Sequence, residues 1–359
     1  MESLRKLLAL DEPLIIAGPC SAESETQVLE TAKQIASNKQ VKLFRAGVWK
    51  PRTRPNNFEG NGEKALPWLQ KVKAETGLPT TVEVANAEHV DLALKSGVDV
   101  LWIGARTVAN PFSVQELADA LRGVDIPVMI KNPVNPDVEL WIGAIERVAN
   151  AGISDIVAIH RGFSSFDKTQ YRNQPKWSMP IEFRRRMPDV PMICDPSHIA
   201  GNTLLLFHVA QTALNLDMKG LMIETHINPR EALSDARQQI TPDELGQMLA
   251  TLLYTKTNAS DSTSDVLDTL RQRIDKVDRQ LIEILAERMD AVRKIGEYKR
   301  DNHVTVLQMG RWNEIVNKSI WLGKSLGLQE DIVKKFLDLI HIESIQLQQG
   351  IINGSGRED

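Results

Sequence analysis

The sequence predicts an α/β chain that forms a (β/α)8 TIM barrel, followed by a small all-α helical-bundle domain. Three observations support this prediction. From residue 14 to about residue 255, short apolar runs rich in β-branched residues alternate with amphipathic segments. A polar side chain ends or follows nearly every apolar run. After residue 265 the pattern changes to long segments with helical periodicity.

Eight apolar runs have the length and continuous hydrophobicity of buried parallel strands. They occupy residues 14–18, 41–47, 80–84, 100–105, 127–132, 155–162, 191–197 and 220–226. The helical segments lie at 25–37, 63–75, 88–96, 114–122, 138–150 and 202–215, and a helix that begins at a Thr cap covers 241–255. Eight such units over roughly 240 residues fit a (β/α)8 barrel. A doubly wound open sheet is the alternative, but no Gly-rich dinucleotide motif follows the first strand.

We predict a barrel domain at 1–256, a linker at 257–265, a helical domain at 266–350 and a tail at 351–359. The segment TNASDSTSD (257–265) is polar and has no apolar anchor, as linkers do. Apolar residues then recur along 266–300 as in one amphipathic helix, and 311–322 and 330–349 predict two more. A helix of roughly 35 residues cannot bury its apolar face alone, so a homodimeric bundle is expected.

Composition excludes several classes of protein. The 359 residues fit two domains, and the net charge of −4 does not indicate a nucleic-acid partner. No run of 18 apolar residues exists, so we expect no membrane span, and the N-terminus is too charged for a signal peptide. Two cysteines cannot form a disulfide framework, so a cytoplasmic protein is expected.

Polar side chains stand at the end of every predicted strand. They are Cys20, Arg45, Glu83, Arg106, Lys131, His160, Arg161, His198 and Glu224. In a barrel the C-terminal ends of all strands converge on one mouth, where active sites lie. Solvated loop starts do not readily explain a polar residue at all eight strand ends.

Two groups of these residues suggest different ligands. Cys20, His198, Glu224 and Asp235 offer a thiolate, an imidazole and two carboxylates, which suit Mn2+, Fe2+, Co2+ or Zn2+. Taken alone, a cysteine after an apolar strand is more often a core residue, so the geometry of the mouth has to decide.

The second group is basic: Arg45, Lys50, Arg52, Arg106, Lys131 and Arg161. Isolated lysines and arginines are usually solvated. Several cations at one mouth would repel one another, and anionic ligands with more than one phosphorylated group would relieve that cost.

Seven segments carry a resemblance to a known family. They are AGPCSAES (17–24), FRAGVWKPRTRP (44–55), IGARTVANP (103–111), KNPV (131–134), IHRGF (159–163), DPSHIAG (195–201) and IETHINP (223–229). Together they resemble the shorter barrel type of 3-deoxy-D-arabino-heptulosonate-7-phosphate (DAHP) synthase, which is related to 3-deoxy-manno-octulosonate-8-phosphate synthase. The KPRT run at 50–53 favours erythrose 4-phosphate as the aldehyde, since the octulosonate enzymes carry an Asn-Arg-Ser type run there.

The resemblance implies a role for each matching residue. The metal ligands would be Cys20, His198, Glu224 and Asp235. Phosphoenolpyruvate would contact Arg45, Lys50, Glu83, Arg106, Lys131 and Arg161, with Glu83 ordering a water. Erythrose 4-phosphate would contact Lys50, Arg52 and Thr53. Lys50 would donate a proton to the forming hydroxyl, and His160 would act at the metal or in proton transfer. A Schiff-base aldolase is the competing barrel chemistry.

The long helix carries three cations on one face, because Arg271, Arg288 and Lys299 are spaced at close to whole helical turns. Arg288 either snorkels at a bundle edge or forms a buried pocket for a dicarboxylate. LRQRIDKVDRQLIEILAERMDAVRKIGEYK (270–299) resembles the helical type of chorismate mutase.

That resemblance implies a second activity, the rearrangement of chorismate to prephenate. Arg271 would reach the partner's site, and Arg288 and Lys299 would be catalytic. The substrate would contact Arg271, Arg288, Lys299, Gln308, Arg311, Ser344 and Gln348. The alternative is a non-catalytic module that binds chorismate or prephenate. In either case the helical domain is the available sensor for feedback inhibition by prephenate.

Overall fold

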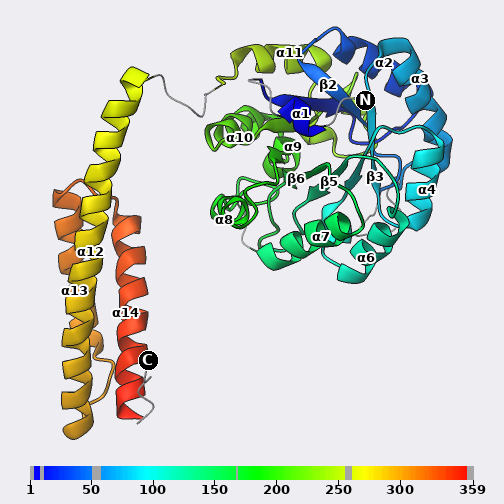
Figure 1. Cartoon of the computed structure of the whole chain (residues 1–359). Coiled ribbons are helices and arrows are strands. Elements are labelled where there is room, and N and C mark those ends of the chain that lie inside the picture. The colour runs from blue at the N-terminus through cyan, green and yellow to red at the C-terminus, as the bar shows by residue number, and fades with distance from the viewer. Residues whose placement is uncertain (1–3, 9–11, 51–57, 167–168, 255–260, 354–359) are drawn as a thin grey trace. The chain divides into compact units, whose positions relative to one another are not determined.

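The structure is a computed structural model, and it describes residues 4–8, 12–50, 58–166, 169–254 and 261–353. The chain divides into two compact units, Met1–Thr257 and Asn258–Asp359 (Figure 1). Each unit has its own secondary structure and its own packing. Within the described residues, no helix has the length and apolarity needed to cross a membrane.

Unit 1 is a closed barrel of eight parallel strands that pair in the order of the sequence, so the predicted fold class is confirmed. The strands are β1 (Leu14–Gly18), β2 (Val41–Arg45), β3 (Thr80–Val84), β4 (Val100–Ile103), β5 (Val128–Lys131), β6 (Ile156–His160), β7 (Met192–Cys194) and β8 (Gly220–Glu224). Several strands end one to three residues before their predicted ends. The residues left over belong to the loops that form the mouth.

Helices surround the sheet on its outer side (Figure 1). The barrel helices are α2 (Glu25–Ala36), α3 (Leu66–Thr76), α4 (Ala87–Lys95), α5 (Ala105–Val108), α6 (Pro111–Ala120), α7 (Val138–Asn150), α8 (Ser178–Arg186), α9 (Pro196–Ala200), α10 (Thr203–Asn215) and α11 (Pro242–Thr251). Short 3-10 turns lie at Gly62–Ala65, Pro229–Glu231 and Ala236–Gln238. The sequence did not predict α8, because three consecutive arginines at its end hide its apolar period.

The barrel has two apolar cores. The larger one fills the space between the strands and the helices. The second lies inside the barrel and includes Leu14, Trp102 and Met222. The short helix α1 (Leu4–Leu8) adds Leu4 and Leu8 to this inner core. The interior is therefore packed with side chains, which leaves the strand ends as the place for chemistry.

Unit 2 is a three-helix unit made of α12 (Asp261–Asp301), α13 (Met309–Ser325) and α14 (Glu330–Ile352). The first helix begins five residues before its predicted start at 266, so residues 261–265 are helical and not linker. Ser, Thr and Asp are common both in linkers and at helix N-termini, so composition alone misplaced this boundary. The last helix continues two residues into the predicted tail.

Gly18, the last residue of β1, has a backbone that requires glycine. Its φ is +145°, and a Cβ atom there would lie 2.1 Å from the carbonyl oxygen of Arg45. Strands β1 and β2 therefore approach closely where Cys20 and Arg45 enter the mouth. This explains the Gly-Pro-Cys order: the glycine permits the approach, and the cysteine follows it.

We predict that Gly18→Ala destabilises the barrel by about 2–3 kcal/mol, because the new methyl group meets a backbone oxygen that cannot move aside. The denaturant midpoint of the barrel's unfolding transition measures this change. Gly246→Ala is the matched control, since its Cβ would meet only Asn38 Nδ2, at 3.9 Å, within helix α11. That substitution should stabilise the barrel by about 0.5–1 kcal/mol. Equal effects of the two substitutions would contradict the account.

Candidate active sites

The centre of the mouth is a buried ion pair between strands β2 and β8. Arg45 Nη2 lies 3.1 Å from Glu224 Oε1, and both side chains are at most 1% exposed. Burial alone would lower the pKa of Arg45, but the carboxylates of Glu224 and Asp195 hold this pKa above its ordinary value. Both groups therefore stay charged inside the protein.

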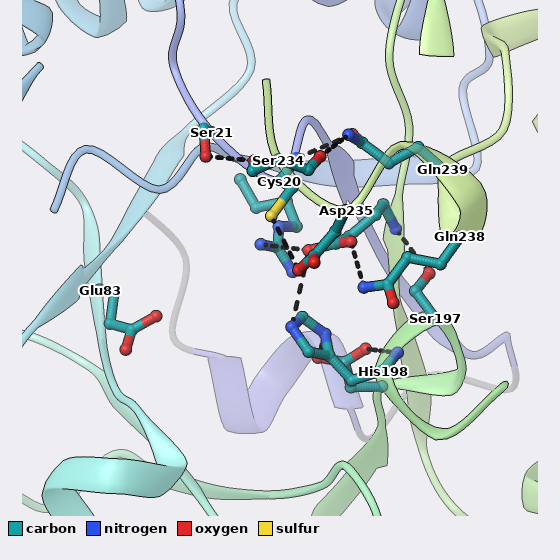
Figure 2. A network of polar contacts seen from close by, with 12 residues as sticks. Cys20, Ser21, Glu83, Ser197, His198, Ser234, Asp235, Gln238 and Gln239 are labelled. Atoms are coloured by element: carbon teal, nitrogen blue, oxygen red, sulfur yellow. Dashed lines mark hydrogen bonds and ion pairs between the residues drawn. The ribbon is translucent and has the colours of Figure 1, made fainter. Parts of the chain in front are cut away.

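Three of the four predicted metal ligands lie together. One oxygen or sulfur atom from each of Cys20, Glu224 and Asp235 lies within 4.8 Å of the other two. Cys20 Sγ is 3.5 Å from Asp235 Oδ2. His198 stands beside this group, with Nε2 3.8 Å from Glu224 Oε1. Figure 2 shows the sulfur of Cys20 directed toward Asp235, with His198 on the other side of Asp235.

Asp195 connects this group to the cationic side of the mouth. Its Oδ2 lies 2.8 Å from His198 Nδ1 and accepts a 2.7 Å hydrogen bond from Lys131 Nζ. Burial opposes the charge of Asp195, but His198 and Lys131 hold its pKa well below its usual range. A carboxylate behind a histidine fixes the ring so that its other nitrogen faces a metal.

The protonation states of the four side chains fit a divalent metal. Burial lowers the pKa of His198, which leaves it neutral at neutral pH. Against the effect of burial, Arg172 and His198 lower the pKa of Asp235 to about 2, and His198 and Arg45 lower the pKa of Glu224. Glu224 Oε1 is buried without a hydrogen bond among the described residues, so it can accept a cation. The donor set thus fits the transition metals that the sequence suggests.

The cationic side of the mouth is built around Trp102 on β4. Arg45 Cζ lies 5.1 Å and Lys131 Nζ 5.9 Å from the centre of its ring, and Trp102 Nε1 donates a 3.1 Å hydrogen bond to Glu83 Oε2. Arg45 Nε and Nη1 are buried without a hydrogen-bond partner in the described part of the chain. These unused N–H groups suit the oxygen atoms of an anionic ligand.

The remaining predicted contacts of phosphoenolpyruvate lie nearby. Burial and the charges of Arg172 and Arg106 lower the pKa of Arg161 to about 10. Arg106 is exposed on α5, and Lys50 Nζ donates a 3.3 Å hydrogen bond to Cys20 Sγ. Arg52 and Thr53, the other predicted contacts of erythrose 4-phosphate, lie outside the described residues.

His160 at the end of β6 is placed differently from the other residues of the mouth. It is fully buried, and its ring lies 5.8 Å from that of Phe163 and 5.3 Å from that of Trp177. Burial and the nearby charge of Arg161 lower its pKa to about 3. The imidazole is therefore neutral at neutral pH and cannot act as a general acid in the imidazolium form.

Sequence reasoning missed residues that hold the mouth from behind. Asp195 begins the DPSH run that ends at His198, and it directly follows strand β7. Its place at a strand end could have identified it as a residue of the mouth. Gln238 Nε2 donates a 2.6 Å hydrogen bond to Glu224 Oε2, and Gln239 Oε1 accepts one of 2.9 Å from the backbone N–H of Cys20. Glutamines in a loop carry no comparable sequence signal.

In unit 2 the structure brings together three of the predicted residues on α12 and α14, Arg288, Ser344 and Gln348. Arg288 Nη1 donates a 2.8 Å hydrogen bond to Ser344 Oγ, and the buried Gln348 lies one turn further along α14. Gly296 allows this approach, since a Cβ there would lie 3.3 Å from Gln348 Cγ. Lys299 Nζ instead donates a 2.6 Å hydrogen bond to the carbonyl oxygen of Val306.

The other predicted residues do not join this group within one chain. Arg271 and Arg311 are more than 60% exposed and pair with Asp268 and Glu314 on their own helices. Gln308, also exposed, is the residue at the N-cap position of α13, where its side chain makes no capping hydrogen bond. Within one chain, the described contacts therefore do not bring Arg271, Gln308 and Arg311 to Arg288.

Two protein families match the chain. The model of the "DAHP synthetase I family" matches residues 8–260, and the model of "Chorismate mutase type II" matches residues 270–349. A "Phospho-2-dehydro-3-deoxyheptonate aldolase" of Thermotoga maritima is 31% identical over 63% of this chain, which spans 64% of that relative. A "2-dehydro-3-deoxyphosphooctonate aldolase" of Vesicomyosocius okutanii is 30% identical and is covered over 88% of its length.

Solved structures agree with these matches. The crystal structure of the DAHP synthase of Thermotoga maritima is 27% identical, with a TM-score of 0.60 over 67% of this chain and 68% of that one. A truncated form of the Thermotoga enzyme is 25% identical, with a TM-score of 0.58 over 72% of this chain and 88% of that one.

We predict that binding of Mn2+ releases about one proton per site at neutral pH. Burial, reinforced by the charge of Glu224, raises the pKa of the Cys20 thiol to about 11, so the thiol must lose a proton to become a ligand. Affinity for Mn2+ should therefore fall about tenfold for each unit that the pH is lowered. Titration calorimetry in buffers of different ionisation enthalpy measures the released proton. Cys20→Ser should release almost none, and a wild-type protein that releases none would contradict the prediction.

Proposed function

Because the chain belongs to the DAHP synthetase I family, we propose that its barrel condenses phosphoenolpyruvate with erythrose 4-phosphate to give DAHP and inorganic phosphate. The observation that carries this proposal is the buried pair of Arg45 and Glu224. Among the described residues, Arg45 Nε and Nη1 have no hydrogen-bond acceptor and could bind an anion, and Glu224 Oε1 has no hydrogen bond and could bind a metal. One ion pair thus joins an anion site to a metal site.

Each part of the mouth has a proposed task. Cys20, His198, Glu224 and Asp235 would hold a divalent metal. Arg45, Lys50, Arg106, Lys131 and Arg161 would bind phosphoenolpyruvate. A bound metal supplies Lewis acidity toward the aldehyde carbonyl. Trp102 holds one oxygen of Glu83, Oε2, through a hydrogen bond. The other oxygen of Glu83 would order a water.

The chemistry balances without a further reactant. C3 of phosphoenolpyruvate forms a bond to the aldehyde carbon, and the aldehyde oxygen takes a proton from Lys50. Water adds to the cation that this bond leaves at C2 and loses one proton, which restores Lys50. When the C2–O bond to phosphate breaks, the leaving phosphate takes the proton of the new C2 hydroxyl, which leaves a ketone and inorganic phosphate. The chain's cations neutralise the phosphate charge throughout.

The choice of aldehyde rests on the KPRT run at 50–53. The relatives named octonate aldolases show that the same family of barrels serves another sugar. We assign erythrose 4-phosphate to this chain because of that run, with Lys50, Arg52 and Thr53 as its contacts. The two cysteines are both free thiols, which suits the reducing cytoplasm where we place the reaction.

We predict that Lys50→Met lowers turnover by about 10²-fold or more, while Mn2+ still binds, because the forming hydroxyl loses its proton donor. Phosphate release with phosphoenolpyruvate and erythrose 4-phosphate measures the rate, and calorimetry measures metal binding. Lys71→Met, which changes an exposed lysine on α3, is the control and should leave both unchanged. Retained turnover in Lys50→Met would sink this role. Inactivation of the wild type by borohydride plus substrate would instead indicate a Schiff base.

We propose further that unit 2 rearranges chorismate to prephenate as a homodimer. The Arg288–Ser344 contact places a guanidinium where a carboxylate or the ether oxygen can bind. Within unit 2, Leu270, Ile274, Leu281 and Ile284 on the apolar face of α12 are each more than half exposed. A second copy would cover this face and bring its own Arg271 to the site.

We predict that Arg271→Ala and Arg288→Ala each abolish mutase turnover, measured as loss of chorismate absorbance. After the two variants are mixed and allowed to exchange subunits, activity should return to about a quarter of the wild-type value. Half of the dimers are then mixed, and each mixed dimer has one intact site out of two. Full activity in either variant alone would contradict the mutase assignment, and no recovery on mixing would contradict the crossing arginine.

We also propose that prephenate bound to unit 2 slows the reaction of the barrel. We predict that saturating prephenate lowers the synthase rate of the wild type several-fold, in the range of typical allosteric coupling. Arg288→Ala, which removes the proposed ligand contact, should keep the basal synthase rate and lose the inhibition. Equal inhibition of both proteins would place the prephenate site elsewhere, and no inhibition of the wild type would remove the proposal.

A further inference from the structure

Arg172 and Asn173 lie in the long connection between β6 and α8, and both face the mouth. Their backbone is held in place: Arg172 N donates to Ile199 O at 3.1 Å. Gln174 exchanges two 2.8 Å hydrogen bonds with Phe163, which follows the end of β6. A loop segment anchored in this way can position its side chains with the precision that a site requires.

Arg172 lies next to one carboxylate of the metal group and reaches the other through Gln238. Its Nη1 is 2.9 Å from Asp235 Oδ1 and donates a 2.6 Å hydrogen bond to Gln238 Oε1. Gln238 in turn donates a 2.6 Å hydrogen bond from Nε2 to Glu224 Oε2. Figure 2 shows Gln238 and Cys20 on either side of Asp235.

The division of oxygens gives these contacts their meaning. Asp235 gives Oδ1 to Arg172 and turns Oδ2 toward Cys20 Sγ. Glu224 gives Oε2 to Gln238 and turns Oε1 toward His198 and Arg45. In each carboxylate, one oxygen is held from behind and the other is left for the proposed metal. Such supporting contacts orient ligands and tune their affinity.

Asn173 does the same for the anion side. Its Oδ1 accepts a 2.8 Å hydrogen bond from Arg161 Nη1, and its Nδ2 donates a 2.6 Å hydrogen bond to the carbonyl of His198. Arg172 and Asn173 thus contact three proposed site residues. These are the side chain of Arg161, the backbone of His198 and the side chain of Asp235.

The surroundings are shaped to admit this pair. Gly201, which ends the short helix that carries His198, has φ +69°, and a Cβ there would lie 2.3 Å from Arg172 Cβ. Gly162 has φ +76°, and a Cβ there would lie 2.9 Å from Asn173 O. Both glycines allow the segment to approach where any larger residue would push it away.

We propose that Arg172 and Asn173 are positioning residues that set the metal ligands and the phosphoenolpyruvate arginine in register from one loop segment. This inference rests on the proposed function, because it takes its metal and substrate assignments from there. Arg172 acts on the metal side through Asp235 and Gln238. Asn173 acts on the substrate side through Arg161.

The test separates metal affinity from substrate affinity in the full-length protein. Arg172→Gln should weaken Mn2+ binding about 10- to 100-fold by calorimetry, while the KM for phosphoenolpyruvate at saturating Mn2+ changes less than about twofold. Asn173→Ala should raise that KM about tenfold, since the charged donor Arg161 loses the acceptor of its hydrogen bond. Arg172→Lys, which keeps the charge but cannot reach both partners with one planar group, should fall between wild type and Arg172→Gln.

Arg184→Gln is the matched control, because Arg184 pairs with Asp217 at 2.8 Å with similar exposure and touches none of the mouth. It should change neither constant, and melting temperatures report any general loss of structure. Unchanged Mn2+ affinity in Arg172→Gln would overturn this inference but not the proposed function. So would an equal shift of the Mn2+ affinity and of the KM for phosphoenolpyruvate in both Arg172→Gln and Asn173→Ala. A wild-type protein that binds no Mn2+ would overturn the proposed metal site and the inference with it.

Discussion

The ion pair between Arg45 and Glu224 is the contact on which the mouth depends. Charges inside a protein persist only when they are paired, and breaking such a pair leaves an expensive unpaired charge. Here, within the part of the chain that the structure describes, Arg45 Nε and Nη1 and Glu224 Oε1 have no hydrogen-bond partner. The barrel brings β2 and β8 to the two sides of β1, and Gly18 lets the strands come close enough for the contact.

Around this pair the mouth divides into an anionic side and a cationic side that support each other. Asp195 lies between them, with Lys131 on one oxygen and His198 beside it. In the proposed reaction, a metal group next to anion-binding cations would hold the aldehyde beside the phosphorylated enol, and each charge would keep a partner. Unit 2 follows the same logic with Arg288, whose partner Ser344 is neutral and leaves the charge available to a ligand.

The sequence predicted the barrel because eight buried strands keep a continuous apolar pattern, and it predicted the mouth because parallel strands end on one side. It could not predict Arg172, Asn173 or Gln238, since loop residues far apart in the chain meet only after folding. The missed α8 has a different cause, because the three arginines at its end hide its apolar period. Asp195 lay within reach of sequence reasoning, but nothing along the chain shows that it stands between Lys131 and His198.

The central claim is that one buried mouth joins a metal site to an anion site. Crystals of the protein grown with Mn2+ and phosphoenolpyruvate, with anomalous diffraction measured at the manganese edge, test it most directly. The account predicts a manganese peak bonded to Cys20, Glu224, Asp235 and His198, with phosphoenolpyruvate oxygens on Arg45. A manganese peak away from Cys20 and Glu224, or phosphoenolpyruvate bound without contact to Arg45, would contradict it.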